Sequence, residues 1–585
     1  MFKPIEGQPD FPAMEEEVLA FWNKNQTFQK SQENRKGAPE YVFYDGPPFA
    51  TGMPHYGHLL AGTIKDVVPR YQTMRGKLVP RTFGWDCHGL PVENEMEKEL
   101  KLTSKKDIEA FGIDNFNEAC RGIVLRYTSE WEQVVNRMGR WVDFRNGYRT
   151  MDLNYMESIW WVFRSLWDKG LIYEGNKILP YCPRCATPLS NFEANQGYSD
   201  VTDPAITIRF KVKDTPNTYL LAWTTTPWTL PSNMALAVGA DIDYVKIRDG
   251  ADFYIMAETR VSAYYKETPE IVERFKGETL KELQYEPLFP YFADLSKDGA
   301  FRVVCADYVS TEDGVGIVHT APGFGEEDSL CGKANGIPEV CPVDEQCCFT
   351  AEVSDYAGRY VKDTDKEIIQ RLKEEGKLVY RGTIKHSYPH CWRDDVPLIY
   401  RAISTWFVDI SQVKAKMLEA NRQITWMPPH IKEGRFGKWL ENARDWAISR
   451  NRYWGTPLPI WRNEEGETIC IGSVEELEKL SGEKISDLHK HFMDKIIIPS
   501  PTGKSPLKRI PEVLDCWFES GAMPYAQHHY PFENKEHFEA HYPADFIAEG
   551  QDQTRGWFYT LVVLGAALFD KPAFQNVIVN GMILA

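Results

Sequence analysis

The sequence has 585 residues, of which 43% are hydrophobic and 26% charged, and its formal net charge at pH 7 is −17. This length exceeds what one hydrophobic core supports, so we expect a globular protein of two or more domains. The acidic balance excludes unselective coating of nucleic acid, and the lack of long apolar runs or a signal peptide predicts a cytoplasmic protein without membrane contact.

The first 90 residues predict a helix followed by a βαβ unit. Apolar side chains of residues 13–24 recur with helical spacing, which predicts an amphipathic helix packed on a larger body: Met14, Val18, Phe21 and Trp22. "YVFYDGPP" (41–48) predicts a buried strand that ends in a turn. A helix should follow His58, with Pro69 kinking it near its end, and a second strand is expected around 77–86. The order predicts an α/β fold with a parallel sheet.

In the rest of the chain the pattern of apolar and turn residues changes twice. Residues 154–168 predict a helix, and 200–385 hold short strand-like runs broken by turn residues, which predicts a β-rich insertion. Residues 406–545 read as mixed, with a helical stretch through 436–443, and "NVIVNGMILA" (576–585) reads as a last strand.

Two histidines stand where the first predicted strand gives way to a helix, in "PPFATGMPHYGH" (47–58). A helix start offers unpaired N–H groups and a positive dipole end, so His55 and His58 could add donors for a phosphate there. Small Gly52 and Gly57 would let a nucleotide approach the backbone. Spacing alone leaves a structural helix start and a zinc site open as alternatives.

The segment "DGPPFATGMPHYGH" (45–58) resembles the His-x-Gly-His signature of class I aminoacyl-tRNA synthetases, and "GWDCHGLPVE" (84–93) is similar to the form found in isoleucyl-tRNA synthetases. The resemblance continues through further segments in family order: "CPRC" (182–185), "WTTTPWTLPSN" (223–233), "GVGIVHTAPGFGEED" (314–328), "DWAISRNRYWG" (445–455), "DCWFESG" (515–521) and "EGQDQTRGWFY" (549–559).

The resemblance implies a ligase that activates isoleucine with ATP and Mg²⁺ and transfers it to tRNA(Ile), acting as a monomer. By family position, His55 and His58 would be catalytic and would contact ATP, together with Gly57, Glu549, Gly550 and Gln553. Asp86 would hold the substrate ammonium group, and Pro47, Trp517, Gln553 and Trp557 would shape the amino-acid pocket. For the tryptophans the alternative is plain core packing.

A pocket that distinguishes isoleucine from valine gains only ~1–3 kcal/mol of selectivity from one methylene. A second, hydrolytic site that removes misattached valine would supply the missing selectivity. The resemblance implies that the β-rich insertion carries this editing site, with Thr224, Thr225, Thr226, Thr229, His319 and Asp328 as its residues. Asp328 would pair with the ammonium group of misattached valine. The alternative is that threonine is common in strands because it suits them.

Twelve dispersed cysteines with one Cys-x-x-Cys pair predict reduced thiols and a metal rather than a disulfide framework. Cys182 and Cys185 have the spacing of half a zinc site, and Cys391 could join them. A fourth ligand from Asp394, His386 or His390 and a metal-free turn both remain open.

The family's Lys-Met-Ser-Lys-Ser signature and its anticodon-binding region do not occur in the sequence up to Ala585. The resemblance therefore implies an amino-terminal portion that is weak in activation. Valyl- or leucyl-tRNA synthetase and a non-catalytic binding module are the alternatives. The expected domains are the first half of a Rossmann-type catalytic domain (1–180), a zinc-ribbon-like connector (181–199), the editing domain (200–385), a return connector (386–405), a second connective region (406–540) and the incomplete second half of the catalytic domain (541–585).

Overall fold

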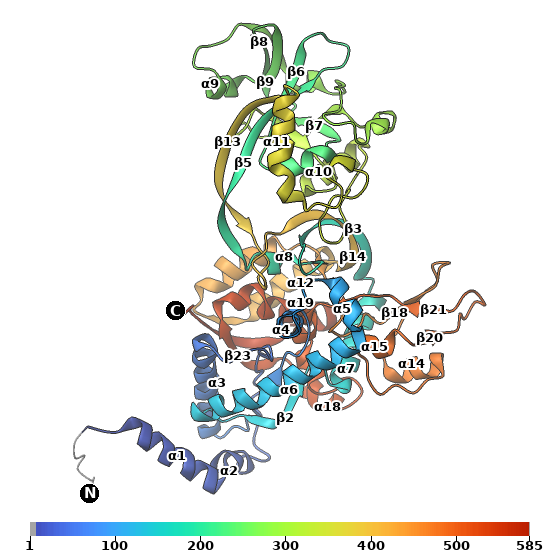
Figure 1. The fold of residues 1–585 in the computed structure, drawn as a ribbon. Helices are drawn as coiled ribbons and strands as arrows, with labels where there is room; N and C mark the ends of the chain where they lie inside the picture. The colour runs from blue at the N-terminus through green and yellow to red at the C-terminus, as the bar shows by residue number, and fades with distance from the viewer. Residues whose placement is uncertain (1–7, 584–585) are drawn as a thin grey trace. The chain divides into compact units, whose positions relative to one another are not determined.

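The computed structural model describes residues 8–583, which form two compact units (Figure 1). The two-part unit joins the residues up to Glu174 with those from Trp406 onward, and the β-rich unit is Gly175–Thr405. Within 8–583 no helix combines the length and the apolar character that crossing a bilayer requires. The predicted α/β class with a β-rich insertion is confirmed.

Parallel strands organise the two-part unit. β24 (Phe574–Asn580) lies between β15 (Thr425–Met427) and β23 (Ala544–Gly550), and all three run parallel. Phe43 adds a parallel bridge to Phe546 of β23. β1 (Thr82–Trp85) pairs in parallel with β2 (Asp143–Arg149), and Phe49 bridges Asp86 just beyond β1. The loops after these strands therefore meet at one edge, where a parallel sheet binds ligands.

Helices cover these strands, and their apolar faces form the core around Phe83, Trp85, Phe116 and Trp131. The helices of the amino-terminal part are α1 (Phe11–Asn25), α2 (Thr27–Glu33), α3 (Tyr56–Met74), α4 (Leu90–Leu100), α5 (Lys105–Phe111), α6 (Ile113–Arg137) and α7 (Leu153–Asp168). Those of the carboxyl-terminal part are α12 (Ile410–Gln423), η7 (Lys432–Gly437), α13 (Lys438–Glu441), α14 (Val474–Ser481), α15 (Lys490–Met493), α16 (Cys516–Gly521), α17 (Met523–Ala526), α18 (Lys535–His541), η8 (Gln551–Arg555) and α19 (Trp557–Phe569).

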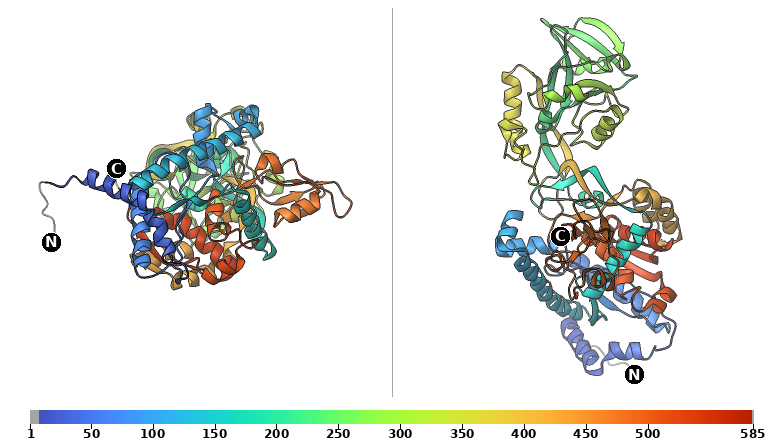
Figure 2. Two further views of the ribbon diagram at one scale, coloured as in Figure 1. Left: turned by 90° about the horizontal axis from the view of Figure 1, so that it is seen from below. Right: turned by 90° about the vertical axis from the view of Figure 1, so that its right-hand side faces the viewer.

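A small antiparallel sheet with α14, coloured orange, projects from the two-part unit in the left view of Figure 2. Its strands run in the order β19 (Thr468–Cys470), β18 (Ile460–Arg462), β21 (Leu507–Arg509) and β20 (Ile497–Ile498). A separate pair joins β17 (Ser449–Arg450) to β22 (Val513–Leu514). The apolar cluster under this lobe includes Trp160 of α7 and Trp461 of β18.

The β-rich unit is built on a nine-stranded sheet with a single large core. Its main path runs in the order β10 (Ile271–Lys276), β8 (Asp243–Asp249), β9 (Asp252–Ala257), β6 (Thr218–Thr224), β12 (Ile317–Thr320), β7 (Ala235–Val238) and β11 (Arg302–Cys305). The long strands β5 (Tyr198–Lys211) and β13 (Leu378–Pro389) pair with each other, and β5 joins β6. Its α-helices are α8 (Asn191–Ala194), α9 (Val261–Tyr264), α10 (Glu326–Asn335) and α11 (Asp365–Glu374), and its 3-10 helices include η1 (Pro227–Ser232).

β3 (Ile172–Cys182) and β14 (Ile399–Val408) carry the chain from one unit to the other. In the two-part unit the end of β14 pairs with β16 (Trp446–Ala447), and in the β-rich unit the end of β3 pairs with β4 (Thr187–Pro188), both antiparallel.

Some local predictions were wrong. α1 forms, but it has no buried residue, and Met14, Val18 and Phe21 are exposed; only Trp22 packs, 5.2 Å from the ring of Trp141. Residues 41–48 make one isolated bridge, at Phe43, instead of a strand, because Gly46, Pro47 and Pro48 cannot sustain a ladder. The helical prediction for 436–443, in contrast, is confirmed up to Glu441, as the end of the π helix η7 followed by α13, and residues 442 and 443 lie outside the helix. The last strand ends at Asn580, and residues 584–585 lie outside the described part.

Candidate functional sites

His55 and His58 cap the helix that follows the first loop. His55 is the N-cap of α3, and its Nδ1 atom accepts a hydrogen bond from the Gly57 N–H at 3.1 Å. The Nδ1 atom of His58 accepts from the His55 N–H at 3.2 Å, and the two rings stack with centroids 3.7 Å apart. A Cβ atom on Gly57 would lie 2.8 Å from the His55 ring, so a larger residue at this position would displace that ring.

These hydrogen bonds fix the tautomers. Because each Nδ1 atom accepts, each neutral imidazole carries its proton on Nε2, where it is a donor. Burial, together with the charges of His55 and Lys65, lowers the pKa of His58 to about 3, so His58 is neutral at physiological pH. The helix start therefore presents two Nε2–H donors beside the positive end of its dipole, as a phosphate requires.

A buried ion cluster that the sequence did not reveal lies next to this helix start. The Nζ atom of Lys65 lies 2.7 Å from Asp45 Oδ1 and 2.6 Å from Glu549 Oε1, and Arg140 pairs with the other oxygen of Asp45. Burial raises the pKa of Asp45, but Arg140 and Lys65 outweigh it and hold that pKa below the usual value. For Glu549 burial dominates and raises the pKa. Lys65 thereby ties the first loop to the end of β23.

The predicted amino-acid residues meet at the same edge. Asp86, only 2% exposed, donates its backbone N–H to Pro48 O at 2.9 Å, so it lies against the loop that carries Pro47. Two residues further on, the Phe49 ring packs edge-on against Trp517, at 5.9 Å between centroids. The structure therefore places Pro47, Asp86 and Trp517 in one neighbourhood.

Trp557, the first residue of α19, lies next to the first loop on the same side. A Cβ atom on Gly46 would lie 3.1 Å from the Trp557 ring, which shows how closely the first loop approaches it. The Trp557 backbone N–H donates to Gln553 Oε1 at 3.0 Å, and its indole N–H donates to Ser520 O at 3.0 Å. Gly550 ends β23 opposite Asn580 of β24. Residues some 500 positions apart in the sequence thus share one edge of the sheet.

A chain of hydroxyls leads to a buried histidine in the β-rich unit. Thr224 Oγ1 lies 3.3 Å from Thr226 Oγ1, which lies 3.1 Å from Thr229 Oγ1, and the latter lies 3.0 Å from His319 Nε2. This chain skips Thr225, which is half-buried. Burial lowers the pKa of His319 to about 4.

Asn233 sets the tautomer of His319. Its amide Nδ2 donates to Ala235 O and to His319 Nδ1, at 2.9 and 2.8 Å, while its Oδ1 accepts from the Tyr285 hydroxyl at 2.7 Å. His319 therefore carries its proton on Nε2 and donates it to Thr229, whose own hydroxyl donates to Thr226 O at 2.8 Å. Asn233 and Tyr285 are site residues that the sequence reasoning missed.

Asp328 lies in the first turn of α10, close to the end of β12. Its carboxylate accepts from the Ala321 N–H at 2.9 Å and from the Tyr308 hydroxyl at 3.1 Å, and burial raises its pKa. The ring of Phe324 packs edge-on against Trp228 at 5.1 Å, which brings the loop before α10 to the threonine segment. Asp365 accepts from the Trp228 N–H at 2.9 Å, and burial raises its pKa to about 7.

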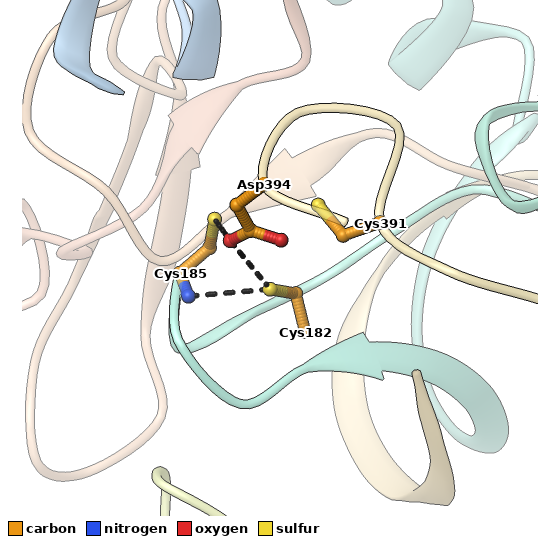
Figure 3. Close-up of side chains that lie close together, drawn as sticks. All are labelled: Cys182, Cys185, Cys391 and Asp394. Atoms are coloured by element: carbon orange, nitrogen blue, oxygen red, sulfur yellow. Dashed lines mark hydrogen bonds between the residues drawn. The ribbon is translucent and has the colours of Figure 1, made fainter. Parts of the chain in front are cut away.

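Three cysteines and one aspartate converge in the β-rich unit (Figure 3). The ligand atoms of Cys182, Cys185, Cys391 and Asp394 all lie within 4.8 Å of one another. Asp394 Oδ2 lies 3.3 Å from Cys182 Sγ and 3.2 Å from Cys185 Sγ, close to the edges of about 3.5 Å that a tetrahedral zinc site requires. The cysteines are buried, and thiol hydrogen bonds from Cys182 and Cys185 lower the pKa of Cys391.

Among the alternatives for the fourth position, the geometry favours Asp394. His386 pairs with Asp203 at 3.0 Å, and His390 Nδ1 donates to Tyr388 O at 3.0 Å. Asp394 faces the cysteines because a tight turn returns the chain from Cys391 to Val396, whose N–H donates to Asp394 Oδ1 at 3.1 Å.

Comparison with known proteins agrees with this architecture. Residues 17–585 match the family model described as tRNA synthetases class I (I, L, M and V). Three similar curated proteins are each named isoleucine–tRNA ligase. The one from Treponema denticola is 61% identical over 621 residues, and that match takes in 100% of this chain and 56% of the relative. The one from Chlamydia trachomatis serovar L2 is 59% identical over 584 residues (99% and 56%), and the one from Bdellovibrio bacteriovorus is 58% identical over 590 residues (100% and 56%).

The chain thus spans about half the length of these relatives. The family model covers the histidine loop, the β-rich unit and the edge formed by β23 and β24 in one continuous match, and the resemblance of the motif segments to this family is confirmed. The chain belongs to the class I tRNA synthetases of the isoleucine, leucine, methionine and valine group.

Proposed function

We propose that this chain carries the amino-acid-activating and editing machinery of an isoleucine–tRNA ligase, with isoleucine, ATP and tRNA(Ile) as substrates. One observation carries the proposal: the loop of residues 46–58, Asp86, α16 and the β23–α19 junction assemble where two parallel sheets, β15–β24–β23 and β1–β2, are bridged by Phe43 and Phe49. The name shared by relatives 58–61% identical to this chain supports isoleucine over valine or leucine.

In the proposed reaction the isoleucine carboxylate attacks the α-phosphate of ATP and pyrophosphate leaves. The Nε2–H groups of His55 and His58 donate to phosphate oxygens, whose charge grows as the reaction proceeds. Both histidines act as donors through Nε2–H, since Nδ1 of each accepts from a backbone N–H. Mg²⁺, when bound with ATP, supplies further charge neutralisation.

The amino-acid end is held by Asp86 and by apolar walls. A carboxylate that is 2% exposed suits a substrate ammonium group, because an opposite charge in a site of low dielectric binds strongly. Pro47, Trp517 and Trp557 enclose the branched side chain. Gly550 and Gln553 border the adenylate, and Lys65 orients Glu549 beside them.

The β-rich unit is proposed to remove valine attached by mistake. Thr224, Thr226 and Thr229 form a chain of hydroxyls that His319 holds in place. This chain orients the ester and a water molecule, and Thr225 belongs to the same segment. Asp328 pairs with the free ammonium group of the valyl ester. Trp228 and Phe324 narrow the site.

The cysteine cluster is proposed to hold Zn²⁺ as a structural ion. Cys182, Cys185 and Cys391 with Asp394 complete four ligands, and closed tetrahedral sites of this kind stabilise small loops.

Two assays test the proposal. Pyrophosphate exchange should depend on isoleucine and proceed at least tenfold faster than with valine or leucine; equal or faster exchange with leucine would overturn the assigned specificity. Deacylation of valyl-tRNA(Ile) should fall at least tenfold in Asp328→Ala and stay unchanged in Asp313→Ala, an exposed aspartate of the same unit. Undiminished hydrolysis by Asp328→Ala would remove Asp328 from the editing site.

A further inference from the structure

Two histidines on α18 face one carboxylate in the two-part unit, away from the residues assigned above. His537 Nε2 lies 3.2 Å from Glu40 Oε2, and His541 Nε2 lies 3.7 Å from the same oxygen. The two rings stack with centroids 4.4 Å apart, as residues one helical turn apart do. All three ligand atoms lie within 4.8 Å of one another.

The hydrogen bond made by Nδ1 of His541 determines whether the Nε2 atom of the same ring is a donor or an acceptor. Nδ1 of His541 donates to the His537 backbone carbonyl at 2.8 Å, so the neutral ring carries its proton there. Its Nε2 lone pair then points toward Glu40, and two acceptors that face each other at 3.7 Å repel each other unless a proton or a metal ion lies between them. Such a hydrogen bond from the other ring nitrogen is the arrangement that orients metal-bound histidines.

The spacing also fits a metal ion. Ligands about 2.1 Å from a tetrahedral zinc ion stand about 3.3 Å from each other. The distances from Glu40 Oε2 to the two imidazoles are 3.2 and 3.7 Å, and all three ligand atoms lie within 4.8 Å of one another, so side-chain rotations would bring them to this spacing. Glu40 is 14% exposed, and the histidine side chains are 45% and 33% exposed, which keeps one coordination position open to water.

We propose that Glu40, His537 and His541 form a second metal site, which binds a divalent ion with a preference for imidazole, Zn²⁺ or Ni²⁺ before Mg²⁺ or Ca²⁺. Imidazole suits the transition metals, whereas Mg²⁺ and Ca²⁺ take oxygen ligands. The site would fasten the segment that enters the first loop to the helix that precedes β23.

Zinc binding by the EDTA-treated chain, measured by equilibrium dialysis, tests the proposal. The wild type should bind one more zinc ion than His541→Asn or Glu40→Gln, or bind this additional ion at least tenfold more tightly than either variant. Any zinc bound by the cysteine cluster is the same in all three proteins and does not affect the comparison. His430→Asn is the matched control, since His430 is exposed and distant in sequence. Near-UV circular dichroism in EDTA establishes that each variant is folded.

A second measurement needs no variant. Zinc should shift the Nε2 resonances of His537 and His541 in histidine-labelled wild-type protein and leave those of His430 in place, and it should raise the melting temperature by binding the folded state. Equal zinc stoichiometry and affinity in the wild type and in both site variants, or Nε2 resonances that zinc does not move, would overturn the proposal.

Discussion

The Nε2–H group of His319 donates to the Thr229 hydroxyl at 3.0 Å. This direction follows from the opposite ring nitrogen, which accepts from Asn233. One amide therefore determines which way every hydrogen bond in the threonine chain runs.

Asn233→Ala should lower the free energy of unfolding by about 1–3 kcal/mol, because it leaves His319 Nδ1 and the Tyr285 hydroxyl buried without their partner. Urea unfolding followed by fluorescence measures the change. Asn146→Ala, which removes an exposed amide that donates to Asp143, should cost less than about 0.5 kcal/mol. An Asn233 variant as stable as the Asn146 variant would contradict this account.

His58 should remain neutral and carry its proton on Nε2 at every pH above about 4. Its pKa is lowered from 6.5 to about 3, so the unfolded chain binds more protons than the native one between these values. The stabilising contribution is therefore full above pH 6.5 and is lost as the pH falls toward 3. Nitrogen-15 spectra of the labelled rings measure the titration, and a midpoint near 6.5 would refute the assignment.

Asp365→Asn should stabilise the β-rich unit at pH 8. The pKa of Asp365 is raised from 3.8 to about 7, so between these pH values the native state binds one more proton than the unfolded state. The stabilising effect of this proton is full below pH 4 and is lost as the pH rises through 7. An amide keeps the hydrogen bond from Trp228 without the buried charge. We expect a gain of about 1–2 kcal/mol at pH 8 and none at pH 4, allowing for solvent screening.

Thermal unfolding at the two pH values measures this difference. The control is Asp363→Asn, an exposed carboxylate two residues away. The explanation fails if Asp365→Asn shifts the melting temperature equally at pH 4 and pH 8.

Lys65→Met should destabilise the two-part unit by about 3 kcal/mol or more, because Asp45 and Glu549 lose their shared counter-charge while buried. Lys24→Met, at an exposed position of α1, should have little effect. The double variant Lys65→Met with Glu549→Gln should be less destabilised than the sum of the two single changes, and simple additivity would exclude the coupling.

Cobalt-substituted protein should show near-ultraviolet absorption from thiolate ligands, and Asp394→Ala should weaken that binding at least tenfold by opening the fourth position. Asp395→Ala, the neighbouring residue, is the control. A cobalt spectrum without thiolate bands would exclude Cys182, Cys185 and Cys391 as ligands.

The sequence predicts those parts of the sites that depend on neighbours along the chain. Gly57 and the two histidines form a local helix cap, and the threonine segment forms one local turn, so the residues themselves indicate the arrangement. The α/β class and the β-rich insertion follow from hydrophobic spacing.

The parts that the sequence does not predict depend on long-range contacts. Lys65 lies in an ordinary helical pattern, and nothing near it in the chain indicates that Glu549 will neutralise it. The selection of Asp394 over His386 depends on strand pairing, which places His386 beside Asp203. Helical spacing predicted α1 correctly but not its exposure, since periodicity does not show what a helix packs against.

The central position of β24 has a consequence for synthesis. β24 lies between β15 and β23, and β23 in turn pairs with the segment around Phe43. The β-rich unit is continuous in sequence, so it can fold as soon as it leaves the ribosome. The histidine loop emerges before that unit, yet its partners, Glu549 and Trp557, are translated some 500 residues later. The histidine loop is therefore among the first segments translated and among the last to make its native contacts.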